Sequence, residues 1–207
     1  MKRKSKIKLK PSRLVFLIVL VAANTFAWFI YATRVDTNID VHVKSWNVTF
    51  EAGQNEVTNI VNIAVDDIYP GMTNYSYAIT AYNRSEVPAT LSFTILEARV
   101  LFDRYVTTEG RALSHEQSQV GDLSSAQLQT KLATDYPFTI TLGLSGTSIQ
   151  QGNGTQTFNI GVVWPYENNH DDIDTYWGTQ AHAYKTAYPT NSSITIKVKL
   201  TITQASS

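Results

Sequence analysis

Residues 194–203 read Ile194-Thr195-Ile196-Lys197-Val198-Lys199-Leu200-Thr201-Ile202-Thr203, with apolar and polar side chains alternating throughout. Successive side chains of a β-strand point to opposite faces, so this run predicts an antiparallel strand with one buried face. The same period of two recurs along the rest of the chain. The further segments that show it are 57–65, 75–81, 91–95, 138–145 and 158–164.

Turn-forming residues separate these segments. In Tyr69-Pro70-Gly71, the proline ring fixes φ and the glycine can adopt a positive φ, which is typical of a turn. Gly152-Asn153-Gly154 predicts a hairpin connection between two strands. Pro88 and Pro165 fall at strand ends, where a missing N–H costs least. Strands that each have one apolar face close most simply into a mainly β, two-sheet antiparallel sandwich, jelly-roll-like in order.

One segment departs from this period. Residues 122–134 predict a short helical insertion, with Ser124 or Ser125 as its N-cap and with Leu128 and Leu132 on one side. The polar residues 107–121 before it predict a loop.

Charge is unevenly distributed, although the formal net charge of the chain is zero. Residues 1–13 hold seven of the 17 Lys and Arg residues and no acid, which leaves ten basic against 17 acidic residues in the remainder. An acidic body argues against nucleic acid as a partner. The absence of cysteine excludes disulfides, thiol catalysis and thiolate metal sites.

The N-terminus has the layout of an export signal. The basic residues 1–13 precede the apolar residues 14–32, which are long enough either to form a secretory signal peptide or to persist as a membrane anchor helix. A signal peptidase would cut between Ala27 and Trp28, because Thr25 and Ala27 place small side chains at the −3 and −1 positions. Residues 33–207 then form the extracellular β-sandwich domain.

Three features of the chain resemble the TasA/camelysin group of exported bacterial matrix proteins. They are the junction Asn24-Thr25-Phe26-Ala27-Trp28-Phe29, the turn Ile68-Tyr69-Pro70-Gly71-Met72 followed by a strand that ends at Tyr82-Asn83-Arg84-Ser85, and the order of strands around the helical insertion. The resemblance implies a jelly-roll body and a structural role in biofilm matrix fibres, where the N-terminal strand of one subunit completes the sheet of the next.

A cleaved N-terminal segment has the residues to act as such a donor strand. Its apolar candidates are Trp28, Ile30, Val35 and Ile39. Unpaired backbone groups at a sheet edge offer hydrogen bonds to an incoming strand, and unlike contact surfaces allow a chain of subunits to continue as a filament. The expected partners are therefore copies of the chain or other matrix proteins, and the membrane before cleavage.

The stretch 164–178 predicts an acidic loop with aromatic residues at both ends. Its candidate ligand residues are Trp164, Glu167, Asp171, Asp172, Asp174 and Trp177. Crowded carboxylates suit Ca²⁺, and aromatic rings beside carboxylates suit sugars, although the spacing is not that of an EF-hand. The alternatives are a solvated acidic loop, with Trp164 closing a core strand and Trp177 fixing the loop to the body.

No enzyme motif supports catalysis. The four histidines are widely spaced, with no His-Glu-x-x-His frame, no Gly-x-Ser-x-Gly elbow and no phosphate-binding glycine loop. We therefore expect a non-enzymatic, exported surface protein without a required cofactor. A membrane-anchored module that binds a glycan or protein through residues 164–178 is the alternative.

Overall fold

The computed structural model describes residues 12, 15–16, 19–22, 45–167 and 170–205. The chain divides into two compact units, Met1–Val43 and Lys44–Ser207. The described residues between 12 and 22 are helical, and none of the helices within the described ranges is long and apolar enough to cross a membrane. The predicted signal or anchor segment 14–32 lies mostly outside the described residues, and so does the predicted cleavage site.

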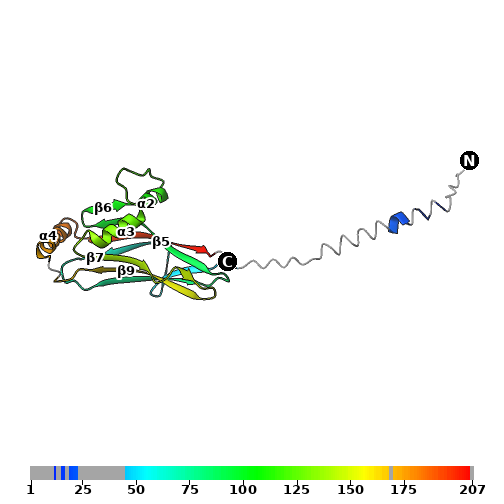
Figure 1. Ribbon diagram of the computed structural model, residues 1–207, viewed down its shortest axis with the longest axis horizontal. Helices are drawn as coiled ribbons and strands as arrows, with labels where there is room; N and C mark the ends of the chain where they lie inside the picture. Colours follow the sequence, from blue (N-terminus) through cyan, green and yellow to red (C-terminus); the bar gives the residue numbers. More distant parts are fainter. Residues whose placement is uncertain (1–11, 13–14, 17–18, 23–44, 168–169, 206–207) are drawn as a thin grey trace, which may run out of the picture. The chain divides into compact units, whose positions relative to one another are not determined.

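The first sheet of the body has five strands in the order β2-β1-β4-β9-β7, and every neighbouring pair is antiparallel. β4 is the middle strand of this order, and β9 pairs with β4 on one side and with the edge strand β7 on the other (Figure 1). The strands are β1 (Val48–Ala52), β2 (Asn55–Val57), β4 (Tyr75–Asn83), β7 (Thr139–Leu144) and β9 (Gly154–Val163).

The second sheet follows the order β3-β10-β5-β6, with the short β8 also paired to β5. β10 pairs with β5 along its whole length and with β3 over residues 194–199, so the run that opened the sequence analysis is an interior strand of this sheet. The strands are β3 (Ile60–Val65), β5 (Ala89–Val100), β6 (Asp103–Val106), β8 (Ser148–Ile149) and β10 (Ile194–Gln204).

The core lies between the inner faces of the two sheets. From β10 it receives Ile194, Ile196, Val198 and Leu200, each at most 1% exposed. From the first sheet it receives Ile79, Ile140, Phe158 and Ile160, also buried. The predicted mainly β body with two antiparallel sheets is therefore confirmed, and the alternating residues face the core as expected.

Two strand-level predictions were wrong. The segment 57–65 is not one strand, because a break at Thr58 and Asn59 leaves Val57 in the first sheet and sends β3 to the second. Gly152-Asn153-Gly154 does not connect a hairpin, because β8 pairs with β5 whereas β9 lies in the other sheet. The alternation of apolar and polar residues predicts which side chains of a strand are buried. It does not predict which of the two sheets the strand joins.

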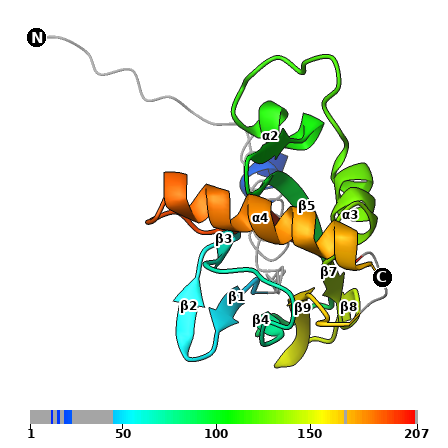
Figure 2. The same cartoon turned by 90° about the vertical axis from the view of Figure 1, so that its left-hand side faces the viewer.

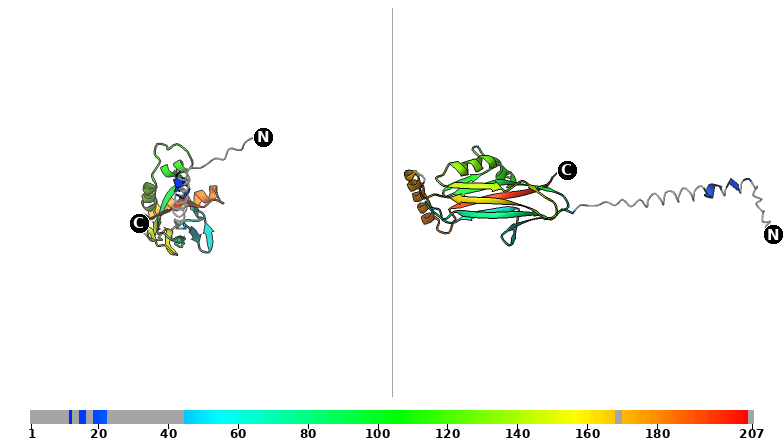
Figure 3. Two further views of the ribbon diagram at one scale, coloured as in Figure 1. Left: turned by 90° about the vertical axis from the view of Figure 1, so that its right-hand side faces the viewer. Right: turned by 60° about the horizontal axis from the view of Figure 1, so that its bottom comes forward.

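Within residues 45–167 and 170–205, three helices lie outside the two sheets. The predicted insertion is confirmed as α3 (Ser125–Thr134), capped by Ser124 in a capping box with Gln127. The predicted loop 107–121 instead begins with α2 (Thr108–Leu113). α2 packs so closely on β5 that a Cβ on Gly110 would lie 2.1 Å from the Leu96 carbonyl oxygen. α4 (Asp171–Ala187) lies across one end of the sandwich, away from the C-terminus (Figures 2 and 3).

Candidate functional site

The predicted acidic loop 164–178 is largely helical, which corrects the sequence analysis. Only residues up to 170 precede α4, and Asp171, Asp172 and Asp174 form its first turn. Carboxylates are favourable there because a helix N-terminus carries partial positive charge. The missed signal is the spacing of Trp177, Ala181 and Tyr184, which puts three apolar side chains on one helix face.

Three of the six predicted ligand residues pack in the core or against it. The indole N–H of Trp164 donates a 2.8 Å hydrogen bond to Oδ1 of Asp174, and the two side chains are 1% and 6% exposed. This bond ties the end of β9 to the first turn of α4 and satisfies a buried donor. Trp177 packs edge-on against Tyr136, at 5.0 Å between ring centroids, so it also fixes α4 to the body.

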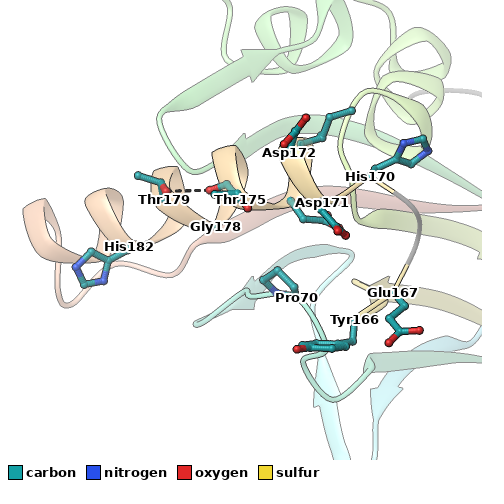
Figure 4. Close-up of a pocket in the computed structure, with 12 residues that line it drawn as sticks. Pro70, Tyr166, Glu167, His170, Asp171, Asp172, Thr175, Gly178, Thr179 and His182 are labelled. Atoms are coloured by element: carbon teal, nitrogen blue, oxygen red, sulfur yellow. Dashed lines mark hydrogen bonds between the residues drawn. The ribbon is translucent and has the colours of Figure 1, made fainter.

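The other predicted residues, Glu167, Asp171 and Asp172, are exposed and line an open groove beside the start of α4. Figure 4 shows Tyr166 and Glu167 on one side of this α4 groove, with Asp171 and Asp172 across from them on the helix. Within the described ranges, no group of three or more His, Cys, Asp or Glu side chains could hold a metal ion. The groove therefore gives the calcium hypothesis no structural support.

A turn of unusual geometry shapes one wall of the α4 groove. Gly71 has a φ of 76°, and its N–H donates a 2.9 Å hydrogen bond to the carbonyl of Trp164. A Cβ at this position would lie 3.1 Å from Cβ of Tyr166, so glycine is needed both for the conformation and for the close approach. The turn holds the Tyr166 side chain, which is 75% exposed, at the rim of the groove.

A second candidate site is an incompletely paired sheet edge on β4. β1 pairs only with Thr80–Asn83, because the chain turns at Gly53, with a φ of 63°, and runs back as β2. Tyr75–Ile79 therefore pair with β9 on one side, while no strand in the described part of the chain occupies the other side. We call these five residues the β4 edge.

The register identifies the free backbone groups of the β4 edge. Arg84 N–H donates to the Asn47 carbonyl, and Glu86 N–H donates to the Ser45 carbonyl, so even-numbered residues form the hydrogen-bonded pairs on the β1 side. Antiparallel pairing alternates with a period of two, so the N–H and C=O groups of Ser76 and Ala78 point toward the unoccupied side. Both residues are exposed.

The inner-face side chains of β4 are less buried beyond the point where its pairing with β1 ends. Ile79 and Ala81 on the inner face of β4 are each 1% exposed, whereas Tyr75 and Tyr77 on the same face are only partly buried. Burial raises the pKa of the Tyr75 hydroxyl, and neighbouring Tyr77 and Asp66 raise it further. The β4 edge therefore offers an incoming strand both hydrogen-bonding groups and apolar surface.

Three of the other sheet edges are shorter than the β4 edge or are covered by a helix. On β7, the Gln129 side chain of α3 donates a 2.9 Å hydrogen bond to the Leu142 carbonyl, so a helix covers that edge. β6 is only four residues long and exposes Asp103 and Arg104, which discourages strand addition. β2 is three residues long. The fourth edge differs from these: β3, six residues long, pairs with β10 and has no strand beyond it within the described residues, so it is a second edge open to strand addition.

The predicted donor residues Trp28, Ile30, Val35 and Ile39 lie outside the described residues, as do Ala27 and the junction around it. The sequence analysis identified these residues but not the edge that would accept them. Nothing local marks Ser76 and Ala78 as unpaired, because that depends on where the β1–β2 hairpin turns.

Comparison of the chain with protein-family models, with curated proteins and with solved structures gave no match. The functional argument therefore depends on the chain's own sequence and geometry.

Replacing Asp174 tests the structural role of this side chain. Asp174→Ala leaves the buried Trp164 indole N–H without its acceptor, so the free energy of unfolding is expected to fall by about 1–3 kcal/mol. Asp172→Ala is the matched control, because it also removes a carboxylate from the first helical turn, and it is expected to cost about 0.5 kcal/mol. Chemical denaturation measures both values. Equal losses would contradict a structural role for the Trp164–Asp174 bond.

Proposed function

We propose that the protein is an exported structural component of a bacterial cell surface that forms or decorates biofilm matrix fibres. The proposal includes a jelly-roll-like body, an N-terminal signal or anchor helix and no catalytic activity. Its support is the β4 edge, where a sheet has free backbone groups and partly exposed inner-face tyrosines. The resemblance of residues 24–29 and 68–85 to the TasA/camelysin group supports the same conclusion.

The geometry favours exchange between copies over closure within one chain. The Ser45 carbonyl accepts from Glu86 N–H, so the chain enters the sheet beside the far end of β4, and β1 then runs toward the β4 edge. In this proposal the segment that contains Trp28, Ile30, Val35 and Ile39 pairs with the β4 edge of the next copy. Donor and acceptor are different surfaces, so the contact is heterologous and continues as a filament.

The length of the β4 edge suits a short donor. Five residues of strand span about 17 Å. A donor strand of this length forms backbone hydrogen bonds with the edge, and its successive side chains point alternately to the two faces of the sheet. Apolar donor side chains facing inward would cover Tyr75 and Tyr77. Release of the donor by cleavage after Ala27 makes assembly depend on export.

A second candidate function is a membrane-anchored binding module that uses the α4 groove. The observation that favours it is an exposed ring among exposed carboxylates, since Tyr166 is 75% exposed and lines the groove together with Glu167 and Asp171. Exposed aromatic faces can stack on sugar rings, while carboxylates accept hydrogen bonds from sugar hydroxyl groups.

Replacing Ala78 tests the fibre proposal. Ala78→Pro removes the edge N–H that a donor strand needs, so we expect the concentration required for fibre formation to rise at least about tenfold. The body should still fold, because this N–H points away from β9 and proline is tolerated on sheet edges. Electron microscopy and sedimentation of the processed protein provide the measurement.

Ala78→Val is the matched control, because it changes the same exposed side chain but keeps the N–H. We expect it to form fibres as the unsubstituted protein does. Unimpaired fibre formation by Ala78→Pro, with a circular dichroism spectrum equal to that of the control, would exclude the β4 edge as the acceptor.

Mass spectrometry of the protein recovered from the producing cells separates the two functions. Fibre formation through a free donor predicts a mature chain that begins at Trp28. The anchored binding module predicts that residues 14–32 remain attached. A surface protein that retains these residues and still assembles would contradict release of the donor by cleavage.

A further inference from the structure

The outer face of the second sheet collects the cations that have no ionic partner within the described residues. Residues 45–167 and 170–205 contain eight Lys and Arg residues against 15 Asp and Glu residues. Five of the eight are in ion pairs with carboxylates, namely Arg84, Arg104, Arg111, Lys131 and Lys185. The other three, Arg99, Lys197 and Lys199, form no ion pair there, and all three lie on strands of this sheet.

The register of the sheet places these three cations on one slanting line. Val198 is buried, so its neighbours Lys197 and Lys199 point to the outer face, about 7 Å apart along β10. Arg99 of β5 pairs with Thr195, so it shares this face and is the diagonal neighbour of Lys197, about 7–8 Å away. We call Arg99, Lys197 and Lys199 the cation row.

The neighbours of the cation row do not neutralise it. Arg99 has Arg104 of β6 as its direct cross-strand partner, and like charges in that position destabilise a sheet. The Glu97 carboxylate lies opposite Lys197, but Nε of Arg104 already donates to it at 2.6 Å. An anion from outside the described chain would therefore relieve repulsion on this face.

The first sheet shows that the cation row is not a general property of the body. Its strands β1, β2, β4, β7 and β9 contain no Lys or Arg, and Glu51 and Glu56 are acidic cross-strand partners on it. The described body has nearly twice as many acids as bases, yet its free cations gather on the second sheet. This asymmetry favours an anionic partner that approaches from the side of the second sheet.

Small polar side chains accompany the cation row. Lys199 is opposite Thr94 of β5, and Lys197 is opposite Asn62 of β3. Hydroxyl and amide groups of this kind donate hydrogen bonds to phosphate oxygens, as ammonium and guanidinium groups do. The strand positions that share this face in the described chain carry no aromatic side chain. Single-stranded nucleic acids gain much of their affinity from bases that stack on aromatic rings, so this face suits a polymer without bases.

We propose that the cation row binds a poly(glycerol phosphate) chain, a phosphodiester polymer that carries no bases. Six covalent bonds separate its successive phosphorus atoms, which is about 7 Å in an extended chain and matches the spacing of the row. Each cation then contacts one phosphate, and the Arg99 guanidinium donates two N–H groups to its phosphate. For an exported protein, this contact fastens the body to an anionic polymer of the cell surface. It does not involve the β4 edge, so this proposal and the fibre proposal can fail separately.

Isothermal titration calorimetry of the full chain with poly(glycerol phosphate), repeated at several NaCl concentrations, tests the proposal. Residues 1–13 hold seven further cations, so the contribution of the cation row is measured as a difference between variants. The combined substitutions Arg99→Gln, Lys197→Gln and Lys199→Gln remove three phosphate contacts. We expect them to lower the affinity at least about tenfold and to make the slope of log K against log [NaCl] less negative by about 2.

A second triple variant is the matched control. Arg84→Gln, Lys131→Gln and Lys185→Gln together change the net charge by the same amount, but they remove cations that are already in ion pairs elsewhere. This control should bind the polymer as the unsubstituted chain does, and circular dichroism should show that both variants are folded. Equal losses of affinity in the two variants, or no loss in the first, would overturn the proposal.

Two other polyanions test the class of polymer. Hyaluronate carries one carboxylate for every two sugar rings, so its charges do not match the cation row, and the row substitutions should lower its affinity less. Oligo(dT) with the same number of phosphates should bind no more tightly than poly(glycerol phosphate), because the face offers its bases no aromatic ring. An equal loss of affinity for hyaluronate, or tighter binding of oligo(dT) through the row, would contradict the assignment to a polymer without bases.

Discussion

The pairing of the β4 backbone is the constraint on which the functional account depends. A strand in a sheet needs partners for its N–H and C=O groups on both sides, and β4 has them only at Thr80–Asn83. The turn at Gly53 removes β1 from the remaining five residues. Water can satisfy the exposed groups in a monomer, but another strand satisfies them and buries the neighbouring tyrosines at the same time.

Much of the body could be predicted from local patterns. The alternation in 194–203 identified the face of β10 that is buried, and the same pattern identified β4, β5, β7 and β9. Ser124 and the Leu128–Leu132 pair were enough to predict α3. These successes have one physical cause: side-chain direction along a strand or helix repeats with a fixed period.

The remaining features depend on contacts between distant residues. The sequence does not show that β3 leaves the sheet that holds Val57, nor that Asp174 is buried because Trp164 needs an acceptor. The acidic residues of 164–178 led to the prediction of a ligand-binding loop, whereas three of them form the first turn of α4. The β4 edge was also missed, because it is defined by where β1 ends.

Hydrogen exchange of the Ser76 and Ala78 amides, compared between monomer and assembled fibre, tests the central claim most directly. If a donor strand occupies the β4 edge, both amides exchange rapidly in the monomer and become protected in the fibre, while the paired amides of β9 are protected in both states. Rapid exchange of Ser76 and Ala78 in the fibre would show that the copies associate through another surface.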